Sequence, residues 1–512
     1  MTQFHESPLS DHAGRDRPAN TVRVRFAPSP TGPMHVGGLR SALFNWLFAR
    51  RHKGTFILRI EDTDRKRYEP EALSDLLTSL RWLGLDWDEG PEVGGDYGPY
   101  FQSERVDLYR EYAHQLVENG HAYYCFCAPE RLAQLREEQQ RRKEFVGYDR
   151  HCRDLDPGQS VDRVTAGDTA VVRLKMPLAG QTTFHDMIRG DITVENSTQD
   201  DLILLKSDGY PTYHLANVVD DHLMGITHIM RADEWISTAP RHVQLYQALD
   251  WEMPAIAHLP VVLDPSGKGK MSKRKKASPD GRELPVLVRD FRAAGYLPEA
   301  MFNFLALVGW SYDGHTELMT MEEIVQRFSI EHINPAPAAF NYDKLDHVNG
   351  VYLRELGADD LADRMMPFLE QAGLAADRET VRRLVPLIRE RVKRLDEAPG
   401  VVDFFFAEEP LAYDAALLIP KKMDAASTRV LLGQARAVLD EVSPFTHDLL
   451  ETALRGLAEA MGVKSGQLFA PIRVAVCGRT VAPPLFGTLE VLGREHVLKR
   501  LDLGLERLRA IE

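Results

Sequence analysis

The stretch that decides the fold reads Arg25-Phe-Ala-Pro-Ser-Pro-Thr-Gly-Pro-Met-His-Val-Gly-Gly-Leu-Arg40. The alternating residues that lead into it, 22–26, predict a strand with one buried face. Two prolines and Gly32 then end the strand and force a turn. Beyond His35, apolar residues recur at helical spacing through Leu47. A strand, a tight turn and a helix start together favour the binding of phosphate, because backbone N–H groups and the helix dipole both attract an anion.

The turn carries neither of the common nucleotide-binding motifs. It lacks the G-x-G-x-x-G fingerprint and the GK[ST] of a P-loop, and offers the imidazole of His35 instead. Far downstream, a glycine-punctuated basic loop reads Gly267-Lys-Gly-Lys-Met-Ser-Lys-Arg-Lys-Lys276. Such a cluster alone would more often be a solvated basic run or a localisation signal. Together with the His35 turn, it favours lysines that neutralise charge on a polyphosphate.

These segments resemble the signatures of the class I aminoacyl-tRNA synthetases. His35-Val-Gly-Gly38 is similar to the HIGH signature, and Lys270-Met-Ser-Lys-Arg274 to the KMSKS signature. Gly38 stands where HIGH has its second histidine, and Arg274 replaces the last serine of KMSKS. The resemblance narrows to the bacterial-type glutamyl-tRNA synthetases through three longer strings, Arg25–Gly32, Arg59-Ile-Glu-Asp-Thr-Asp-Arg65 and Ser207–Asp221.

Alternating strand and helix patterns predict an α/β fold. Residues 55–60 read as a buried strand and 72–83 as an amphipathic helix, and such alternation favours a parallel sheet. With the resemblance, this implies a Rossmann-like parallel-sheet catalytic domain, split by an insertion and followed by an all-α anticodon-binding region. The expected segments are a disordered N-terminal extension (1–20), the first half of the catalytic domain (21–105), an inserted acceptor-end-binding subdomain (106–200), the second half of the catalytic domain (201–262), the KMSKS loop and stem-contact region (263–349) and a helical anticodon-binding domain (350–512).

Composition narrows the class of protein. Of 512 residues, 44% are hydrophobic and 27% charged, which is ordinary for a globular chain. No stretch is long and apolar enough to span a membrane, and residues 1–20 lack the apolar segment of a secretory signal. Four cysteines favour a reducing cytoplasm over a disulfide framework. The net charge of −14 discourages nonspecific DNA binding, so we expect local basic faces for RNA.

The predicted substrate pocket joins residues that are distant in sequence. Ligands of open α/β sheets bind at the carboxyl ends of the strands, which places Glu61 and Arg231 near one crevice. Guanidinium matches carboxylate in a two-pronged way, so Arg25 and Arg231 are the natural clamps, although an isolated arginine would more often form an internal salt bridge. Glutamine would leave a desolvated cation unmatched, so we expect a preference for glutamate. By resemblance, the glutamate-binding residues are Arg25, Ala27, Ser29, Glu61, Tyr213, Asn217 and Arg231.

The resemblance also implies a two-step reaction without a covalent enzyme intermediate. The α-carboxylate of glutamate attacks the α-phosphorus of ATP, and the terminal adenosine of tRNA then takes the glutamyl group through its 2′-hydroxyl. We expect Mg²⁺ to shield the leaving pyrophosphate. The expected partners are tRNA(Glu), L-glutamate and ATP, without membrane or DNA, and the expected state is a cytoplasmic monomer. The predicted catalytic residues are His35, Lys270 and Lys273, and the predicted ATP-binding residues are His35, Gly37, Gly38 and Lys273.

A cysteine pattern in the predicted insertion indicates a metal site. Three thiolates and one oxygen can hold a structural zinc ion in a closed four-coordinate site. Some glutamyl enzymes carry zinc here with Cys-x-Cys followed by Cys-x-His, and Asp154 occupies the histidine position. Tyr148 is the other candidate for the fourth ligand, and three ordinary reduced cysteines are the alternative to a metal site. The predicted ligands are Cys125, Cys127, Cys152 and Asp154.

Three other functions stay open. An enzyme that also charges tRNA(Gln) would differ in its anticodon contacts, for which Arg389 and Arg391 are basic candidates that a solvated helix explains equally well. The string at 59–65 and the long helical extension disfavour a small-molecule adenylyl- or cytidylyltransferase. A non-catalytic RNA-binding relative is disfavoured because His35, Lys270 and Lys273 are all present.

Overall fold

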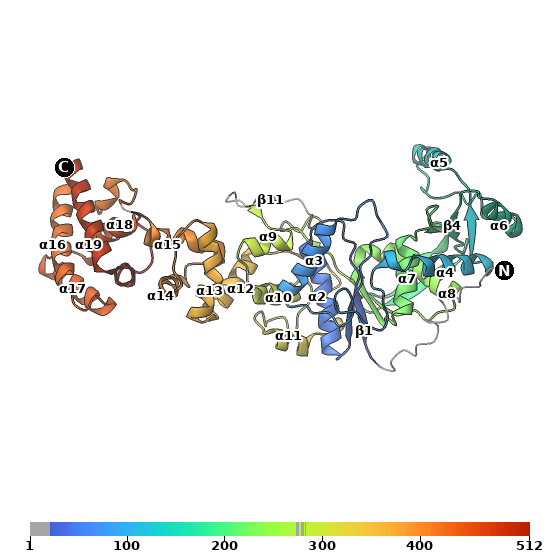
Figure 1. The fold of residues 1–512 in the computed structure, drawn as a ribbon, viewed down its shortest axis with the longest axis horizontal. Coiled ribbons are helices and arrows are strands. Elements are labelled where there is room, and N and C mark those ends of the chain that lie inside the picture. Colours follow the sequence, from blue (N-terminus) through green and yellow to red (C-terminus); the bar gives the residue numbers. More distant parts are fainter. Residues whose placement is uncertain (1–20, 273–275, 278–280, 282, 409) are drawn as a thin grey trace, which may run out of the picture. The chain divides into compact units, whose positions relative to one another are not determined.

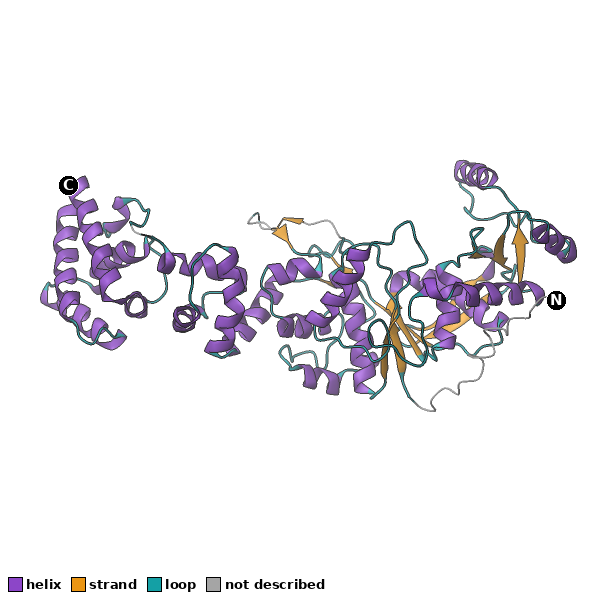
Figure 2. Cartoon of the chain, in the orientation of Figure 1, coloured by secondary structure: helices purple, strands orange, loops and turns teal. Residues whose placement is uncertain are grey.

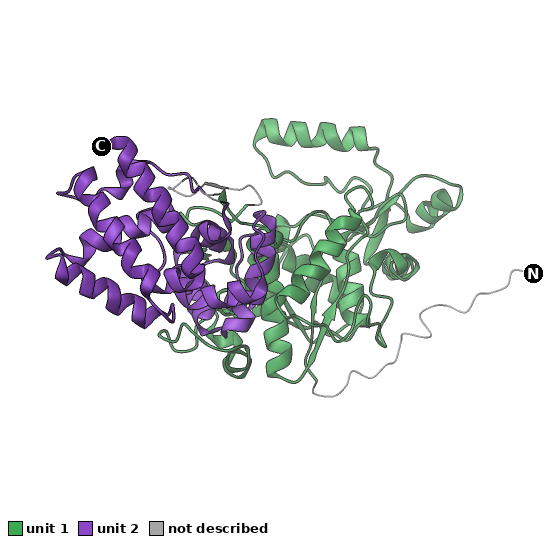
Figure 3. Cartoon of the chain, turned by 60° about the vertical axis from the view of Figure 1, so that its left-hand side comes forward, with its two compact units in different colours: residues 1–291, 301–342 green, residues 292–300, 343–512 purple. Residues whose placement is uncertain are grey.

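The computed structural model describes residues 21–272, 276–277, 281, 283–408 and 410–512. The extension expected at 1–20 and the predicted catalytic residue Lys273 lie outside the described residues. The chain divides into two compact units, which Figure 3 shows in different colours. The first unit comprises Met1–Phe291 and Met301–Tyr342, and the second comprises Arg292–Ala300 and Asp343–Glu512.

Parallel strands form the centre of the first unit (Figure 2). Strand β1 (Arg23–Phe26) pairs in parallel with β2 (Thr55–Leu58). In a second sheet, β8 and β9 are parallel, β5 pairs in parallel with β9, and β5 and β6 are antiparallel. The N–H of Thr227 donates to the carbonyl of Arg23 over 2.9 Å and so links the residue before β8 to β1. The second sheet has the order β6 (Gly190–Glu195), β5 (Gln181–Asp186), β9 (Ala255–Leu259), β8 (His228–Ala232).

Helix α2 (Val36–Arg51) follows the proline-rich turn directly, with His35 as its N-cap. Its residues Leu39, Leu43 and Leu47 are fully buried, and the helix contacts β1, β2 and β8. The helical spacing read from the sequence is therefore confirmed. The other helices of this part of the unit are α3 (Pro70–Trp82), α7 (Tyr213–Leu223) and α8 (Ala239–Ala248).

The predicted insertion has a small antiparallel sheet of its own. Its order is β3 (Ala122–Cys125), β4 (Val171–Leu174), β7 (Ile203–Leu205). Strand β7 lies just beyond the boundary predicted at 200/201, yet it pairs with β4 rather than with the strands of the catalytic sheet. The helices of this region are α4 (Val106–Glu118), α5 (Pro129–Arg142) and α6 (Pro157–Thr165).

Short elements follow β9 in the first unit. Strand β10 (Val262–Leu263) pairs in parallel with β13 (Ala338–Ala339), and β11 (Lys276–Ala277) pairs antiparallel with β12 (Glu283–Leu284). The helices that follow β12 are α9 (Val288–Ala293), α10 (Pro298–Ala306) and α11 (Met321–Arg327), and α9 and α10 each contain residues of both units.

The described residues of the second unit contain helices and no strand (Figure 1). Its helices are α12 (Tyr342–Glu355), α13 (Ala358–Gln371), α14 (Arg378–Ile388), α15 (Ala398–Phe406), α16 (Ala425–Glu441), α17 (His447–Ala460), α18 (Ser465–Cys477) and α19 (Leu485–Ile511). The predicted fold class, an α/β parallel-sheet domain followed by a helical region, is confirmed. The boundaries of the six predicted segments stay predictions. Across the described residues, no helix combines the length and apolarity needed to cross a membrane.

Candidate active site

One cavity of the first unit gathers the residues of the predicted glutamate pocket. It has a volume of about 480 Å³ and lies among the carboxyl ends of β1, β2 and β8 and the start of α7. Ser41, Thr31 and Trp235 also line it and were not singled out in the sequence. Its walls include all seven predicted positions, Arg25, Ala27, Ser29, Glu61, Tyr213, Asn217 and Arg231.

The guanidinium of Arg25 is matched by a carboxylate inside the protein. Its Nε and Nη2 donate to the two carboxylate oxygens of Asp221 over 2.9 and 3.2 Å, and both side chains are buried. Asp221 also accepts a hydrogen bond of 2.7 Å from Arg59. Burial would raise the pKa of Asp221, but the two guanidinium groups outweigh burial and hold the pKa below its usual range. The positive charge of Arg25 is therefore largely balanced by Asp221 where Arg25 lines the cavity.

Glu61 is a buried carboxylate on the opposite side of this network. Its Oε1 accepts from Asn217 Nδ2 over 3.2 Å and from Arg59 Nη2 over 3.3 Å. Burial raises the pKa of Glu61 despite the attraction of Arg59. Asn217 spans one turn of α7 from Tyr213, so this helix start delivers two of the predicted contacts to one wall.

Arg231 differs from both other arginines, because no carboxylate within the described chain pairs with it. Its Nε donates to His258 Nε2 and its Nη1 donates to Tyr213 Oη and His242 Nδ1, each over 3.2 Å. Nη2 is buried and has no hydrogen-bond partner among the residues that the structure describes. The side chain is 6% exposed and lines the cavity. A buried guanidinium with a vacant donor suits an incoming carboxylate.

A second cavity, of about 470 Å³, contains the described residues of the predicted ATP site. His35, Gly37, Gly38 and Lys270 all line it. The Nδ1 of His35 accepts from the N–H of Gly37 over 3.1 Å, so the ring proton of the neutral imidazole is on Nε2. An Nε2–H at a helix N-terminus is a donor of the kind that binds an anionic oxygen.

Backbone pairing brings the basic loop to this second cavity. Leu263 forms an antiparallel bridge with Lys270, and the N–H of Met271 donates to the carbonyl of Val262 over 2.9 Å. The ammonium of Lys270 forms an ion pair with Glu234, and both side chains are about half exposed. The two cavities share three wall residues, Gly38, Ser41 and Ala232. Molecules bound in them would therefore lie side by side.

A third cavity adjoins the glutamate pocket and is lined by charged side chains of both signs. It has a volume of about 520 Å³ and shares Ser29, Glu61, Arg67 and Tyr213 with that pocket. Its cationic lining is Arg65, Lys66, Arg67 and Lys206, and its acidic lining is Glu61, Asp64 and Asp208. Arg67 pairs with Asp64 and Lys206 with Asp208. None of these four cations was assigned a role from the sequence. Arg65 ends the motif string at 59–65, and Lys66 and Arg67 follow it directly, which was the available signal.

The three cysteines of the predicted metal site meet in the insertion. The sulfur atoms of Cys125, Cys127 and Cys152 lie within 4.8 Å of one another. The hydroxyl of Tyr148 lies 3.2 Å from the sulfur of Cys125 and 3.4 Å from that of Cys127. Asp154 is exposed and does not belong to this group. The structure thus places Tyr148, the second candidate, beside the sulfurs.

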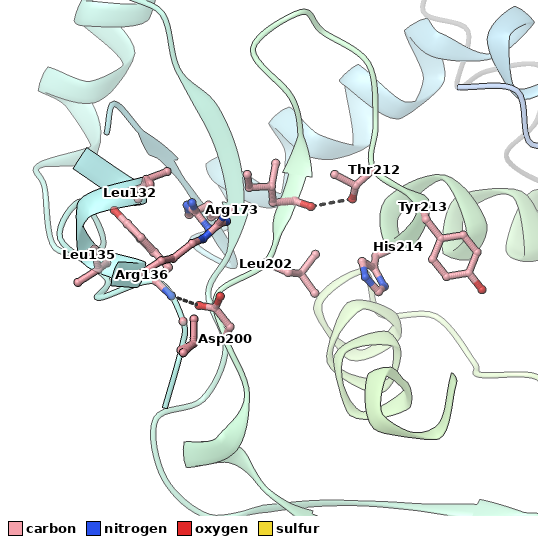
Figure 4. A pocket seen from close by; sticks show the side chains of 13 residues that line it. Leu132, Leu135, Arg136, Arg173, Asp200, Leu202, Thr212, Tyr213 and His214 are labelled. Atoms are coloured by element: carbon pink, nitrogen blue, oxygen red, sulfur yellow. Dashed lines mark hydrogen bonds between the residues drawn. The ribbon is translucent and has the colours of Figure 1, made fainter. Parts of the chain in front are cut away.

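A further cavity lies between the insertion and α7 (Figure 4). Leu132, Leu135 and Arg136 of α5 form one side, and Tyr213 and His214 lie at the other. The N–H of Tyr148 donates to Asp200 over 3.0 Å within its wall. Tyr213 also lines the glutamate pocket and the third cavity, so its ring lies at a junction of three spaces.

Comparison with known proteins gives consistent matches. The model of the catalytic domain of class I tRNA synthetases (E and Q) matches residues 21–347, and an anticodon binding domain matches residues 360–505. The glutamate–tRNA ligase of Roseiflexus sp. (strain RS-1) is 51% identical over 497 residues, covering 94% of this chain and 96% of the relative. That of Dehalococcoides mccartyi is 50% identical over 494 residues, covering 96% and 99%.

A solved structure agrees with these matches. The crystal structure of a glutamate tRNA ligase from Elizabethkingia meningosepticum, in complex with its amino acid, has a TM-score of 0.86 and 34% identity, and covers 95% of this chain and 99% of its own. Together with a catalytic-domain match over more than half of the chain, this shows that the chain belongs to the class I tRNA synthetases of the glutamate and glutamine group and, within that group, to the glutamate–tRNA ligase family.

Proposed function

We propose that this chain activates L-glutamate with ATP and transfers the glutamyl group to the 3′-terminal adenosine of tRNA(Glu). The observation that carries the proposal is the pair of cavities with common walls at Gly38, Ser41 and Ala232. One offers a helix N-terminus with an imidazole donor, which suits phosphate, and the other offers guanidinium groups, which suit carboxylate. The reaction needs those two chemical groups next to each other.

In the first step the protein acts by position and charge. Arg231 and Arg25 hold the amino acid, while His35 donates through Nε2 to an oxygen of ATP. Lys270 and, as a prediction from sequence, Lys273 neutralise charge that develops on the leaving pyrophosphate. Mg²⁺ bound with ATP supplies further neutralisation of the phosphates. No side chain becomes a covalent nucleophile in this proposal.

In the second step the tRNA end must reach the adenylate. The third cavity, with Arg65 and Lys66 in its lining, adjoins the glutamate pocket through Tyr213. Positive side chains beside the reaction centre suit the phosphates of a single-stranded 3′ end, and the ring of Tyr210 in the same lining suits stacking on a base. We assign this cavity to the acceptor end, and the helical second unit to the anticodon.

We also propose one structural zinc ion in the insertion. Three thiols and a phenol hydroxyl around one point form a donor set that fits tetrahedral zinc. The ligands would be Cys125, Cys127, Cys152 and Tyr148, with Asp154 as the alternative to Tyr148. Bound zinc would crosslink β3 to the segment before α6, in addition to the apolar contacts and the Tyr148 hydrogen bonds that already join them.

A monomer in the cytoplasm completes the proposal. All four cysteines are unpaired, which suits a reducing compartment.

Acylation of two transcripts, tRNA(Glu) and tRNA(Gln), with labelled glutamate, ATP and Mg²⁺ tests the function. We expect charging of tRNA(Glu), and ATP consumption that depends on tRNA. Charging of both would mean a nondiscriminating enzyme. Folded protein that charges neither would overturn the proposal and favour a non-catalytic RNA-binding paralogue, and tRNA-independent turnover would favour a small-molecule transferase.

A further inference from the structure

A chain of buried imidazoles lies behind Arg231. The Nδ1 of His258 lies 2.7 Å from Asp186 Oδ2, and its Nε2 accepts from Arg231 Nε. On the other side, Arg231 Nη1 donates to His242 Nδ1, and His242 Nε2 lies 3.0 Å from His214 Nδ1. Asp186, His258 and His242 are at most 1% exposed. The strand register helps to bring these side chains together, because Arg231 of β8 pairs directly with His258 of β9.

The hydrogen-bond donors and acceptors of Asp186, His258, Arg231, His242 and His214 fit one set of histidine tautomers. Arginine can only donate, so His258 Nε2 and His242 Nδ1 must both be acceptors. His258 then carries its proton on Nδ1 and donates it to Asp186, and His242 carries its proton on Nε2 and donates it to His214. A charged imidazolium at either position would turn a donor towards Arg231. The geometry therefore requires both rings to be neutral.

The electrostatic setting keeps these rings neutral. Burial, followed by the charge of Arg231, lowers the pKa of His242 well below its ordinary value, and burial is also the largest cause that lowers the pKa of His258. Arg25 and Arg59, in contrast, contact the carboxylate of Asp221 directly. The protein thus holds two of its three neighbouring arginines with an anion, and holds Arg231 with neutral groups.

We propose that His258 and His242 are positioning residues that set substrate specificity: as neutral acceptors they orient Arg231 without neutralising it, and the side-chain carboxylate of the amino acid supplies the counter-charge. A carboxylate in place of either ring would orient Arg231 equally well but satisfy its charge. Glutamine, which has the same size without the charge, would then lose less relative to glutamate. This inference rests on the proposed function and names the groups behind its specificity.

Two variants of one size at His258 test the inference. His258→Gln keeps a neutral acceptor for Arg231, and His258→Glu replaces it with a carboxylate. Calorimetry on the free protein gives the Kd for glutamate and glutamine, and acylation of tRNA(Glu) gives KM and kcat. We expect His258→Glu to weaken glutamate binding about 10- to 100-fold and to reduce the glutamate-to-glutamine binding ratio by a similar factor, with the KM for ATP unchanged. His258→Gln should retain most of the glutamate affinity of the wild-type protein.

A purely structural role predicts a different result. Equal loss in His258→Gln and His258→Glu, or a glutamate-to-glutamine ratio that does not fall in His258→Glu, would overturn the inference. His228→Gln is the control, because this half-buried histidine is on the same strand but bonds to Thr227. It should leave both affinities unchanged.

A second pair applies if His258→Glu does not fold. His242→Asn keeps an acceptor near the position of Nδ1, whereas His242→Leu removes it at similar size. We expect the leucine variant to bind glutamate about tenfold more weakly than the asparagine variant, because Arg231 loses a hydrogen bond that orients it. Equal affinities would overturn the inference. Wild-type protein that binds glutamate but acylates neither tRNA would contradict the proposed function and leave this binding test intact.

Discussion

At the scale of single residues, Asp221 stabilises the cavity wall by balancing two buried cations. It accepts from Arg25 and Arg59 and is fully buried. Asp221→Asn leaves both guanidinium groups short of their counter-charge, so we expect the free energy of unfolding of this unit to fall by about 3 kcal/mol. Urea denaturation at pH 7 measures it. Asp107→Asn is the control, because Asp107 also pairs with an arginine, Arg110, but its side chain is 84% exposed. Equal effects of the two variants would contradict the prediction.

The buried imidazole of His214 predicts that stability depends on pH. Burial, and then the charges of Arg241 and Arg231, lower the pKa of His214 to about 4, whereas an unfolded histidine titrates near its ordinary value of about 6.5. The unfolded chain therefore binds more protons below about pH 6.5, so stability is complete above that pH and is lost as the pH falls towards 4.

Denaturation curves between pH 7 and pH 5 check this expectation. Each extra proton bound by the unfolded chain contributes a slope of about 1.4 kcal/mol per pH unit, and His214→Gln should remove about one such proton. An unaltered slope in His214→Gln would mean that this ring does not titrate between the two states.

At the scale of elements, the cysteine cluster determines how the insertion holds together. We expect about one zinc per chain in purified protein, and loss of that zinc in Cys125→Ser, since one thiolate of the four-coordinate set is removed. Tyr148→Phe and Asp154→Asn form a matched pair for the fourth ligand. Because the phenol lies beside two sulfurs and Asp154 is exposed, Tyr148→Phe should reduce zinc affinity about 10- to 100-fold and Asp154→Asn should not.

Metal analysis and thermal melting with and without a chelator measure both effects. Wild-type protein without zinc would end the proposal of a metal site and favour three ordinary reduced thiols. A larger effect of Asp154→Asn would restore the ligand set that was first predicted from the sequence.

At the scale of the whole molecule, the second unit contains two separate apolar clusters. One joins Leu297 and Ala300 to residues between Val348 and Val402, and the other extends from Phe404 to Leu508. A chain that ends after Asp403 keeps the first cluster, whereas a chain that ends after Tyr342 uncovers Leu297, which is 2% exposed. We expect the longer fragment to stay monodisperse and the shorter one to bind apolar dyes and aggregate.

Size-exclusion chromatography and dye binding compare the two fragments. The longer fragment also lacks most of the segment matched by the anticodon binding domain, so its KM for tRNA(Glu) should rise at least about tenfold. Equal solubility of both fragments would show that the residues after Tyr342 are not needed to cover Leu297.

The sequence predicted the elements near the motifs well. The strand before the proline turn, the helix after it and the position of His35 at the helix start all follow from local patterns, and the structure bears them out. Strand ends were less predictable: Arg231 was expected just after its strand and lies within β8. The pairing of Ile203–Leu205 with β4 was also missed, because an apolar run does not reveal its partner strand.

By itself, the sequence determined the local elements, the class of fold and the family, since periodicity, turn residues and motif strings depend on neighbours along the chain. The tertiary structure alone decided which distant groups face one another. It placed Tyr148 rather than Asp154 beside the sulfurs, matched Arg25 with Asp221, and gave Arg231 neutral imidazole partners. The physical reason is that strand register and burial set these contacts, and with them the charge balance of each side chain, and neither is encoded in any single stretch of residues.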